Sequence, residues 1–261
     1  MDKIVFQKTS KRQATAVLIL FLASTWTVFG QTVRQTFSDD GELIASKQEG
    51  KKEEKHPVPL VDKDMKLIAL APDQSIFLAA DRKSVVFLAE VCLREGPLEF
   101  FACSKNTKEH ESILATRVKP SLIHVGLLAM GAEPGRPVQF TPKFAPAPGP
   151  RIDIAIRWLD KEGKRQEAKA EEWVQETSSK KQMDTFWVFS GSLFQKLQGG
   201  KNQYVADVTG EIIGVSNFPT VVLDIPIAST SDNSDLLFQA FTEKIPTEGT
   251  VVTVILTRFE K

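Results

Sequence analysis

The sequence predicts an α+β domain rich in β-structure, with mostly antiparallel sheet and one buried helix near residues 120–131. Three observations lead to this prediction. Most apolar runs are short, contain β-branched or aromatic residues and end at turn residues, which is typical of strands. The stretch 151–159 alternates between apolar and polar side chains, which indicates a strand with one packed face. One longer apolar run is bounded by proline and glycine in the order that helices favour.

The alternating stretch, RIDIAIRWL, directs its isoleucines and Trp158 to one face of the predicted strand. A turn with Gly163 follows, so we expect the next segment to return antiparallel. The segment AKAEEWVQE can continue this return strand or form a second, shorter helix. DVTGEIIGV is predicted to form another hairpin, which turns at Thr209–Gly210. Further strands are predicted at 67–71, 75–80, 84–92, 97–103, 112–118, 185–190, 203–208, 211–216, 221–227, 236–241 and 250–258.

The helix is predicted in KPSLIHVGLLAMGAEPG. Pro120 suits the first helical turn, Ser121 is a candidate N-cap, and Gly131 suits the C-terminal stop. Its side chains are apolar on nearly every face, so we expect the helix to be largely buried. A proline-rich stretch follows over 131–150. It is expected to be an extended connection that either divides two lobes or wraps over one domain. A single domain is favoured, because each flank alone would have a thin core.

The N-terminus has the pattern of an export signal. A basic start is followed by an uncharged, mostly apolar run from Ala14 to Gly30. This run is shorter than the roughly 20 residues that a spanning helix needs. We therefore predict a signal peptide, or an uncleaved anchor, over 1–30. The charged residues after it predict a disordered linker over 31–56 and a single folded α+β domain over 57–261.

The charge balance excludes some classes of partner. Residues 1–30 hold four basic residues and one acidic residue, which leaves 29 basic and 32 acidic residues in the rest of the chain. Such a nearly neutral domain gives no electrostatic reason to expect nucleic acid or an anionic membrane surface. We expect contact with a membrane only through the N-terminal segment, if that segment is uncleaved.

The stretch CSKNTKEHES, residues 103–112, is predicted to be a polar loop at the end of a strand. It has no large apolar side chain to draw it into the core, so His110 should be at least partly accessible. It could be only a solvated turn, because Asn106 and Glu109 match a capping box. It could also be a ligand-binding loop with a base, carboxylates and a hydroxyl close together. The candidate binding residues are Lys105, Lys108, Glu109, His110, Glu111 and Ser112.

Other chemistry has weaker support. Glu109, His110 and Glu111 could form a carboxylate-rich metal site, but no H-x-x-x-H pair occurs, so neither a metal site nor a cofactor is predicted. His124 lies among aliphatic residues, which is typical of a core histidine. The serines of FSGS have no identifiable base partner, and no G-x-S-x-G or phosphate-binding glycine pattern is present.

The two cysteines predict one disulfide. In an exported protein a pair of thiols is usually bridged, so Cys92 and Cys103 are expected to form that bond. A tight hairpin through LREG would place the two residues far apart along their strands. The hairpin and the disulfide therefore exclude each other.

Several runs together resemble a known family. These are VCLREGPLEFFACSKNTKEHESILATRVKPSLIHVGLLAMGAEPG, FWVFSGSLF, GVSNFPTVVLDIPI and FTEKIPTEGTVVTVIL. They are similar to the YdjY-type domain of exported bacterial proteins over about residues 60–258, and KEHES and NFPT are the most specific pieces. The resemblance implies an exported compartment and a domain boundary. It implies no catalytic residues, because this is a domain of unknown function.

Three functions remain open on the sequence alone, and whether the chain is an enzyme is undecided. The favoured one is a non-catalytic exported domain, periplasmic, secreted or held at the membrane by its N-terminus, that binds a protein or an envelope component. The others are a hydrolase-type enzyme and a metal or redox protein that uses the loop 105–112. A pocket that holds His110 beside Asp207, Asp224 or Glu211 would favour the enzyme.

Export can be tested with a fusion of residues 1–40 to a reporter that is active only outside the cytoplasm. The fusion should be active, because the basic start followed by the apolar run is the pattern of an export signal. The same fusion without residues 14–30 is the control and should be inactive. A reporter that stays inactive with the whole segment would contradict export.

Overall fold

The computed structural model describes residues 57–73, 75–229 and 236–260, and the backbone of four short strands nearer the N-terminus. The chain divides into two compact units, residues 1–56 and residues 57–261. In the first unit, β1 (Trp26–Val28) pairs with β2 (Gln31–Val33), and β3 (Thr36–Phe37) pairs with β4 (Leu43–Ile44). The predicted signal peptide and linker otherwise lie outside the described residues and stay predictions.

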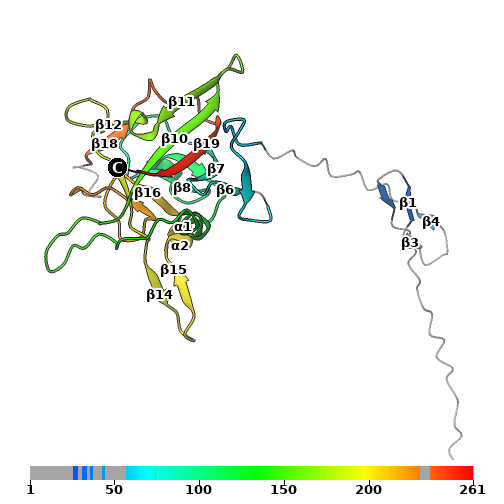
Figure 1. Ribbon diagram of the computed structural model, residues 1–261, viewed down its shortest axis with the longest axis horizontal. Helices are drawn as coiled ribbons and strands as arrows, with labels where there is room; N and C mark the ends of the chain where they lie inside the picture. Colours follow the sequence, from blue (N-terminus) through cyan, green and yellow to red (C-terminus); the bar gives the residue numbers. More distant parts are fainter. Residues whose placement is uncertain are drawn as a thin grey trace, which may run out of the picture. The chain divides into compact units, whose positions relative to one another are not determined.

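The second unit is built on a closed barrel of eight strands (Figure 1). Around the barrel β19 pairs with β10 on one side and with β7 on the other, so the sheet has no open edge there. The parallel pairs are β8–β9 and β16–β17, and the other pairs are antiparallel. The order of strands is β10 (Arg151–Leu159), β13 (Trp187–Phe189), β17 (Leu223–Asp224), β16 (Glu211–Gly214), β8 (Phe100–Ser104), β9 (Ser112–Thr116), β7 (Ser84–Val91) and β19 (Val251–Arg258).

Smaller elements are attached to this barrel. β11 (Arg165–Lys169) extends the sheet beyond β10, and β6 (Ile76–Ala79) and β5 (Leu67–Ala69) extend it beyond β7. Two separate pairs are β12 (Val174–Glu176) with β18 (Phe238–Ala240), and β14 (Phe194–Lys196) with β15 (Asn202–Tyr204). The helices of the described residues are α1 (Pro120–Ala129), α2 (Ala206–Thr209) and the 3₁₀ turns η1 (Glu109–Glu111) and η2 (Ala170–Trp173). None of them is long and apolar enough to span a bilayer.

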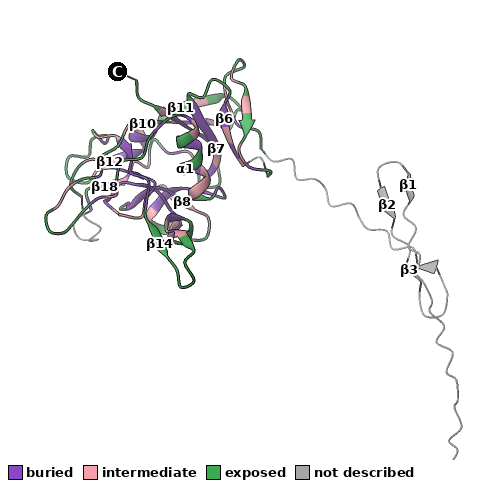
Figure 2. Ribbon diagram, turned by 60° about the horizontal axis from the view of Figure 1, so that its bottom comes forward, coloured by how far each residue is buried: buried purple, intermediate pink, exposed green. Residues whose placement is uncertain are grey.

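The core lies inside the barrel and under the elements that cover it, where Figure 2 shows continuous burial. The isoleucines of the alternating stretch 151–159 face inward and are at most 2% exposed, as the sequence pattern predicts. Phe101 packs against Trp187 with ring centroids 5.5 Å apart, and Trp158 meets Trp173 edge to face. These large aromatic side chains fill the interior with apolar area, which is the main stabilising contribution.

The prediction of a β-rich fold with mostly antiparallel pairing is confirmed, but the closed barrel of mixed direction was not predicted. Closure of the barrel depends on pairing between strands that are far apart in the chain, and a local sequence pattern does not predict such pairing. The predicted hairpin at Thr209–Gly210 is wrong. Residues 206–209 form α2, and Gly210, with φ of +79°, ends it in the left-handed conformation. The segment AKAEEWVQE combines the end of β11 with η2 and β12.

The helix predicted near 120–131 is confirmed as α1, with two corrections. The N-cap residue is Lys119, and Asp207 of α2 accepts a hydrogen bond from Ser121 N at 2.7 Å. A carboxylate from a distant segment therefore satisfies a free N–H group of the first turn. The helix is not buried on every face, because Val125 is 52% exposed and Leu128 is 45% exposed.

Neighbouring leucines of α1 test this orientation. Leu127→Ala should lower the free energy of unfolding by about 2–5 kcal/mol, because Leu127 is fully buried and its loss leaves a cavity. Leu128→Ala is the matched control and should cost less than about 1 kcal/mol. Urea denaturation of both variants measures the difference. Equal losses would show that α1 is rotated from the orientation described.

Candidate functional site

The candidate loop 105–112, which contains KEHES, and the segment NFPT, residues 217–220, meet beside β8 and β16. The ring of Phe218 stacks on the ring of Phe100, with centroids 4.8 Å apart and planes 28° apart. The ammonium of Lys108 lies 5.8 Å from the centroid of the Phe100 ring. Residues more than 100 positions apart in the chain are thus brought together on one aromatic side chain.

Three glutamates from three elements lie around this contact. Glu99 precedes β8, Glu111 ends η1 and Glu211 begins β16; Glu99 and Glu211 are 8% and 7% exposed. The ammonium of Lys108 lies 3.0 Å from Glu111 Oε1, and the hydroxyl of Thr220 donates to Glu211. We call these five residues, Glu99, Lys108, Glu111, Glu211 and Thr220, the carboxylate cluster. It holds three carboxyl groups and one basic side chain.

The imbalance of charge changes how Glu99 ionises. Burial, and then the neighbouring carboxylate of Glu111, raise the pKa of Glu99 to about 7, although Lys108 acts in the opposite direction. The ion pair with the carboxylate of Glu111 raises the pKa of the Lys108 ammonium. Near neutral pH Glu99 therefore holds a proton for a large part of the time, and it shares a hydrogen bond with Glu111.

Glu109 builds the loop instead of joining the cluster. Its carboxylate accepts from Asn106 N at 2.5 Å and from Thr107 N at 3.0 Å. This reaching back is what the predicted capping box implies, but the turn that follows is η1, and its N-cap residue is Lys108. The Thr107 hydroxyl donates to Ser104 O at 2.6 Å and closes the loop.

The other candidate residues of the loop do not belong to the cluster, although His110 lies next to it. Lys105 pairs with Glu90 at 2.7 Å. Ser112 is fully buried and donates its hydroxyl to Lys108 O at 2.7 Å. The side chain of His110 is 74% exposed and lies 3.6 Å from Glu111 Oε2, which agrees with the expected accessibility. Of the six residues predicted from the sequence, the structure brings Lys108 and Glu111 into the cluster.

Sequence reasoning missed Glu99, Thr220 and Phe218, and it named Glu211 only as a possible partner of His110. One signal was present, because Glu99 interrupts the apolar run PLEFFAC and Glu211 begins the apolar run EIIGV. A glutamate in a strand that is otherwise buried needs a partner or a proton. The sequence does not show that the two glutamates come together.

A second buried acid fixes the segment 217–220. Asp224 is fully buried, and burial raises its pKa to about 7. Its Oδ1 accepts from Ile225 N at 2.8 Å and from Asn217 Nδ2 at 3.2 Å, while Oδ2 has no hydrogen-bond partner within the described part of the chain. Asn217 Oδ1 in turn accepts from Ser229 N at 2.8 Å. These bonds hold Asn217 and thereby position Phe218 and Thr220.

The predicted disulfide is absent from the structure, where Cys92 and Cys103 are free thiols. The hairpin alternative is wrong as well, because β9 lies between β7 and β8. Cys92 is opposite residue 113 and Cys103 is opposite Ala115, so a strand separates the two backbones. The two thiols still interact without a covalent bond: the contact with Cys103, and then burial, raise the pKa of Cys92, whose thiol also lies 3.1 Å from Ser112 O.

His124 is a core histidine, as its surroundings in the sequence suggest. The hydroxyl of Tyr204 donates to Gly191 O at 3.0 Å and meets His124 Nδ1 at 2.9 Å. Burial lowers the pKa of His124, so it is neutral at neutral pH. The serines of FSGS donate to backbone carbonyls, Ser190 to Val222 O and Ser192 to Thr220 O.

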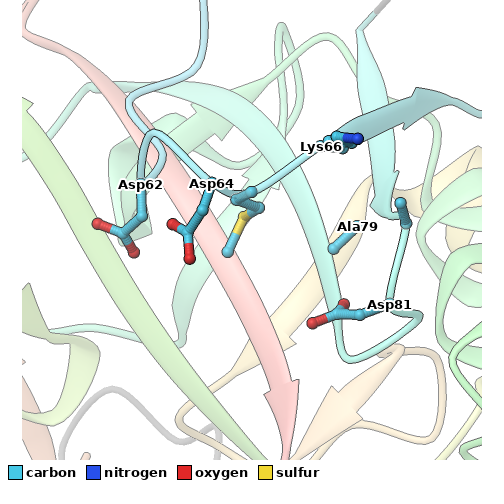
Figure 3. Close-up of a pocket in the computed structure, with 7 residues that line it drawn as sticks. Asp62, Asp64, Lys66, Ala79 and Asp81 are labelled. Atoms are coloured by element: carbon cyan, nitrogen blue, oxygen red, sulfur yellow. The ribbon is translucent and has the colours of Figure 1, made fainter.

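A surface pocket of about 340 Å³ lies elsewhere and contains acidic side chains (Figure 3). Its rim carries Asp62, Asp64 and Asp81. Asp62 is paired with Arg157 at 3.0 Å and with Arg165 at 2.8 Å, which lower its pKa. This charge is therefore already compensated. The described residues contain no group of three or more histidine, cysteine or acidic side chains arranged to hold a metal ion.

Comparison with known proteins identifies one family. The family model of the YdjY domain matches residues 76–257, which is more than half of the chain. The resemblance seen in the sequence is therefore confirmed. No curated protein and no solved structure matches the chain.

The buried proton of Glu99 can be tested by pH. The free energy of unfolding should fall as pH rises from about 4.5 to about 7, because folded Glu99 keeps a proton that the unfolded chain has released. Asp224 contributes with the same sign. In Glu99→Gln the fall should be smaller by about 1–3 kcal/mol, because the amide is neutral and can still donate to Glu111.

Urea denaturation over this pH range gives both profiles, and Glu95→Gln, at an exposed position, is the control. An unchanged profile in Glu99→Gln would mean that Glu99 ionises in the folded protein at an ordinary pH.

Proposed function

We propose that this chain, which belongs to the YdjY domain family, is an exported, non-catalytic binding domain of the bacterial cell envelope. Its ligand is a protein or an envelope component that presents a positively charged group to the carboxylate cluster. One observation carries the proposal: the segments 105–112 and 217–220 converge on carboxylates that the protein itself leaves under-compensated. Export is supported by the basic and apolar pattern of residues 1–30.

The chemistry of the cluster favours a cation. Three carboxyl groups surround one ammonium, so carboxyl groups are in excess and the region becomes more negative when Glu99 ionises. An ammonium or guanidinium group from a ligand would offset this repulsion and lower the pKa of Glu99. Binding should therefore release a proton. The partly exposed Phe218 offers an aromatic surface beside the cluster, which favours cations further.

A hydrolase-type enzyme is the second candidate, and one observation favours it. Glu99 and Glu111 form a carboxylic acid beside a carboxylate, which is a pair that general acid–base catalysis uses. Other features favour binding. The hydroxyl of Ser112 is buried and already donates to Lys108 O. The acids named as possible partners of His110 are engaged elsewhere: Asp207 caps α1, Asp224 binds Asn217 and Glu211 binds Thr220, while His110 lies beside Glu111.

Spermidine, a simple polyamine, can serve as the probe of the cluster. The affinity measured by calorimetry should increase from about pH 6 to about pH 8, because Glu99 must lose its proton as the cation binds. Glu111→Gln should weaken binding by about fivefold, as the loss of a partly exposed ion pair does. Buffers of different ionisation enthalpy should show that a proton is released.

The exposed Glu95→Gln variant is the matched control and should bind as the parent does. Equal affinity in Glu111→Gln and the parent would exclude the cluster as the cation site. Turnover of a model ester or glycoside that is lost in Glu99→Gln would favour the enzyme instead.

A further inference from the structure

One face of the domain exposes apolar side chains from three neighbouring elements. In α1 these side chains are on the face away from the core, in β14 all three residues are exposed, and α2 adds one more. Isolated apolar residues on a surface are ordinary, but a group on adjoining elements indicates an interaction site. We call this group the apolar face; it consists of Val125, Leu128, Leu193, Phe194, Leu197 and Val208.

Side-chain and backbone contacts connect these elements. The ring of Phe194 lies 5.1 Å from the ring of Tyr204, and Tyr204 lies 5.3 Å from His124 of α1. Asp207 of α2 binds the N-terminus of α1 through Ser121 N. The β14–β15 hairpin projects from the barrel beside α1 and α2 (Figure 1), and its exposed strand is visible in Figure 2. Phe194 is the most exposed member of the face, at 65%.

The charge on the β14–β15 hairpin of this face has one sign. From Ser190 to Val205 the charged residues are Lys196 and Lys201, and no aspartate or glutamate occurs. Helix α1 contains no Asp, Glu, Lys or Arg, and the carboxylate of Asp207 is engaged at its N-terminus. The balanced charge of the whole chain therefore hides a local surface that is apolar and basic.

We propose that the apolar face docks on a bilayer surface that contains anionic phospholipid. Phe194, Leu193 and Leu197 enter the interface between head groups and acyl chains, and Lys196 and Lys201 pair with lipid phosphates. A projecting hairpin with large apolar side chains and flanking lysines suits a fluid interface. The apolar side chains match the acyl chains, and the lysines match the negative charge of the anionic head groups. This inference goes beyond the proposed function and does not use the carboxylate cluster.

A second copy of the chain is the main rival occupant. A shallow apolar groove lined by Val58, Leu60, Leu159 and Val251 could receive the hairpin of another molecule. Such a contact joins two different surfaces and would build open chains of molecules unless the rotation closes a ring. The groove holds no acidic side chain to pair with the lysines, so charge favours the lipid.

Hydrogen exchange of the full chain provides a local test that is insensitive to any tether near the N-terminus. Vesicles of equal parts phosphatidylcholine and phosphatidylglycerol should slow exchange in residues 193–204, and vesicles of phosphatidylcholine alone should slow it less. In the double variant Phe194→Ser and Leu197→Ser, about tenfold more lipid or above should be needed to reach the same protection. Lys196→Glu with Lys201→Glu should remove the preference for the anionic vesicles.

The matched control is Phe140→Ser, which removes an aromatic side chain that is 50% exposed on a different loop. It should leave the protection of residues 193–204 unchanged. The melting temperature of each variant shows that the domain stays folded. No change of exchange at the hairpin with either vesicle would overturn the proposal. Protection that depends on protein concentration and not on lipid would overturn it in favour of a second copy.

Discussion

The pairing of β19 with two strands is the constraint on which the rest of this domain depends. Residues 251–257 pair with β7, and residues 253–258 pair with β10. Without β19 both partners would have open edges, and the barrel would be an unclosed sheet. Since β19 lies near the C-terminus, closure joins segments that are more than 150 residues apart. The curvature that brings β8, β9 and β16 together therefore depends on pairing between segments that are distant in the chain.

A closed apolar interior forces charged side chains to its margins, and the domain resolves two such cases differently. Arg157 is 9% exposed, and it binds Glu167 at 2.7 Å and Asp62 at 3.0 Å. Its charge is compensated, so this network is structural. Glu99 is equally buried but faces other carboxylates, and it retains a proton in place of a partner. An under-compensated group at the margin of a rigid barrel is where a ligand can contribute the missing charge.

Much of the fold could be predicted from the sequence, because strands and α1 depend on local patterns. The alternation in 151–159 and the proline before the helix both report the conformation of the residues that carry them. Barrel closure, the parallel β8–β9 pair and α2 depend on distant partners; Thr107 packs where a Cβ at Gly210 would lie. The site was predicted in part for the same reason. Lys108 and Glu111 belong to a conspicuous polar loop. Glu99 and Glu211 can be recognised as site residues only when the pairing of β8 and β16 is known.

Thr220 connects the two surfaces. Its hydroxyl donates to Glu211 in the carboxylate cluster, and its carbonyl accepts from Ser192 at 2.5 Å, one residue before the apolar face begins. Ser190 binds the carbonyls of Val221 and Val222 beside it. One hydrogen-bonded stretch of barrel wall thus carries a site that is rich in carboxylates and a face that is rich in lysine and apolar side chains. Because their charges are opposite, the two surfaces select different ligands, so a cation at the cluster and an anionic lipid at the hairpin do not compete.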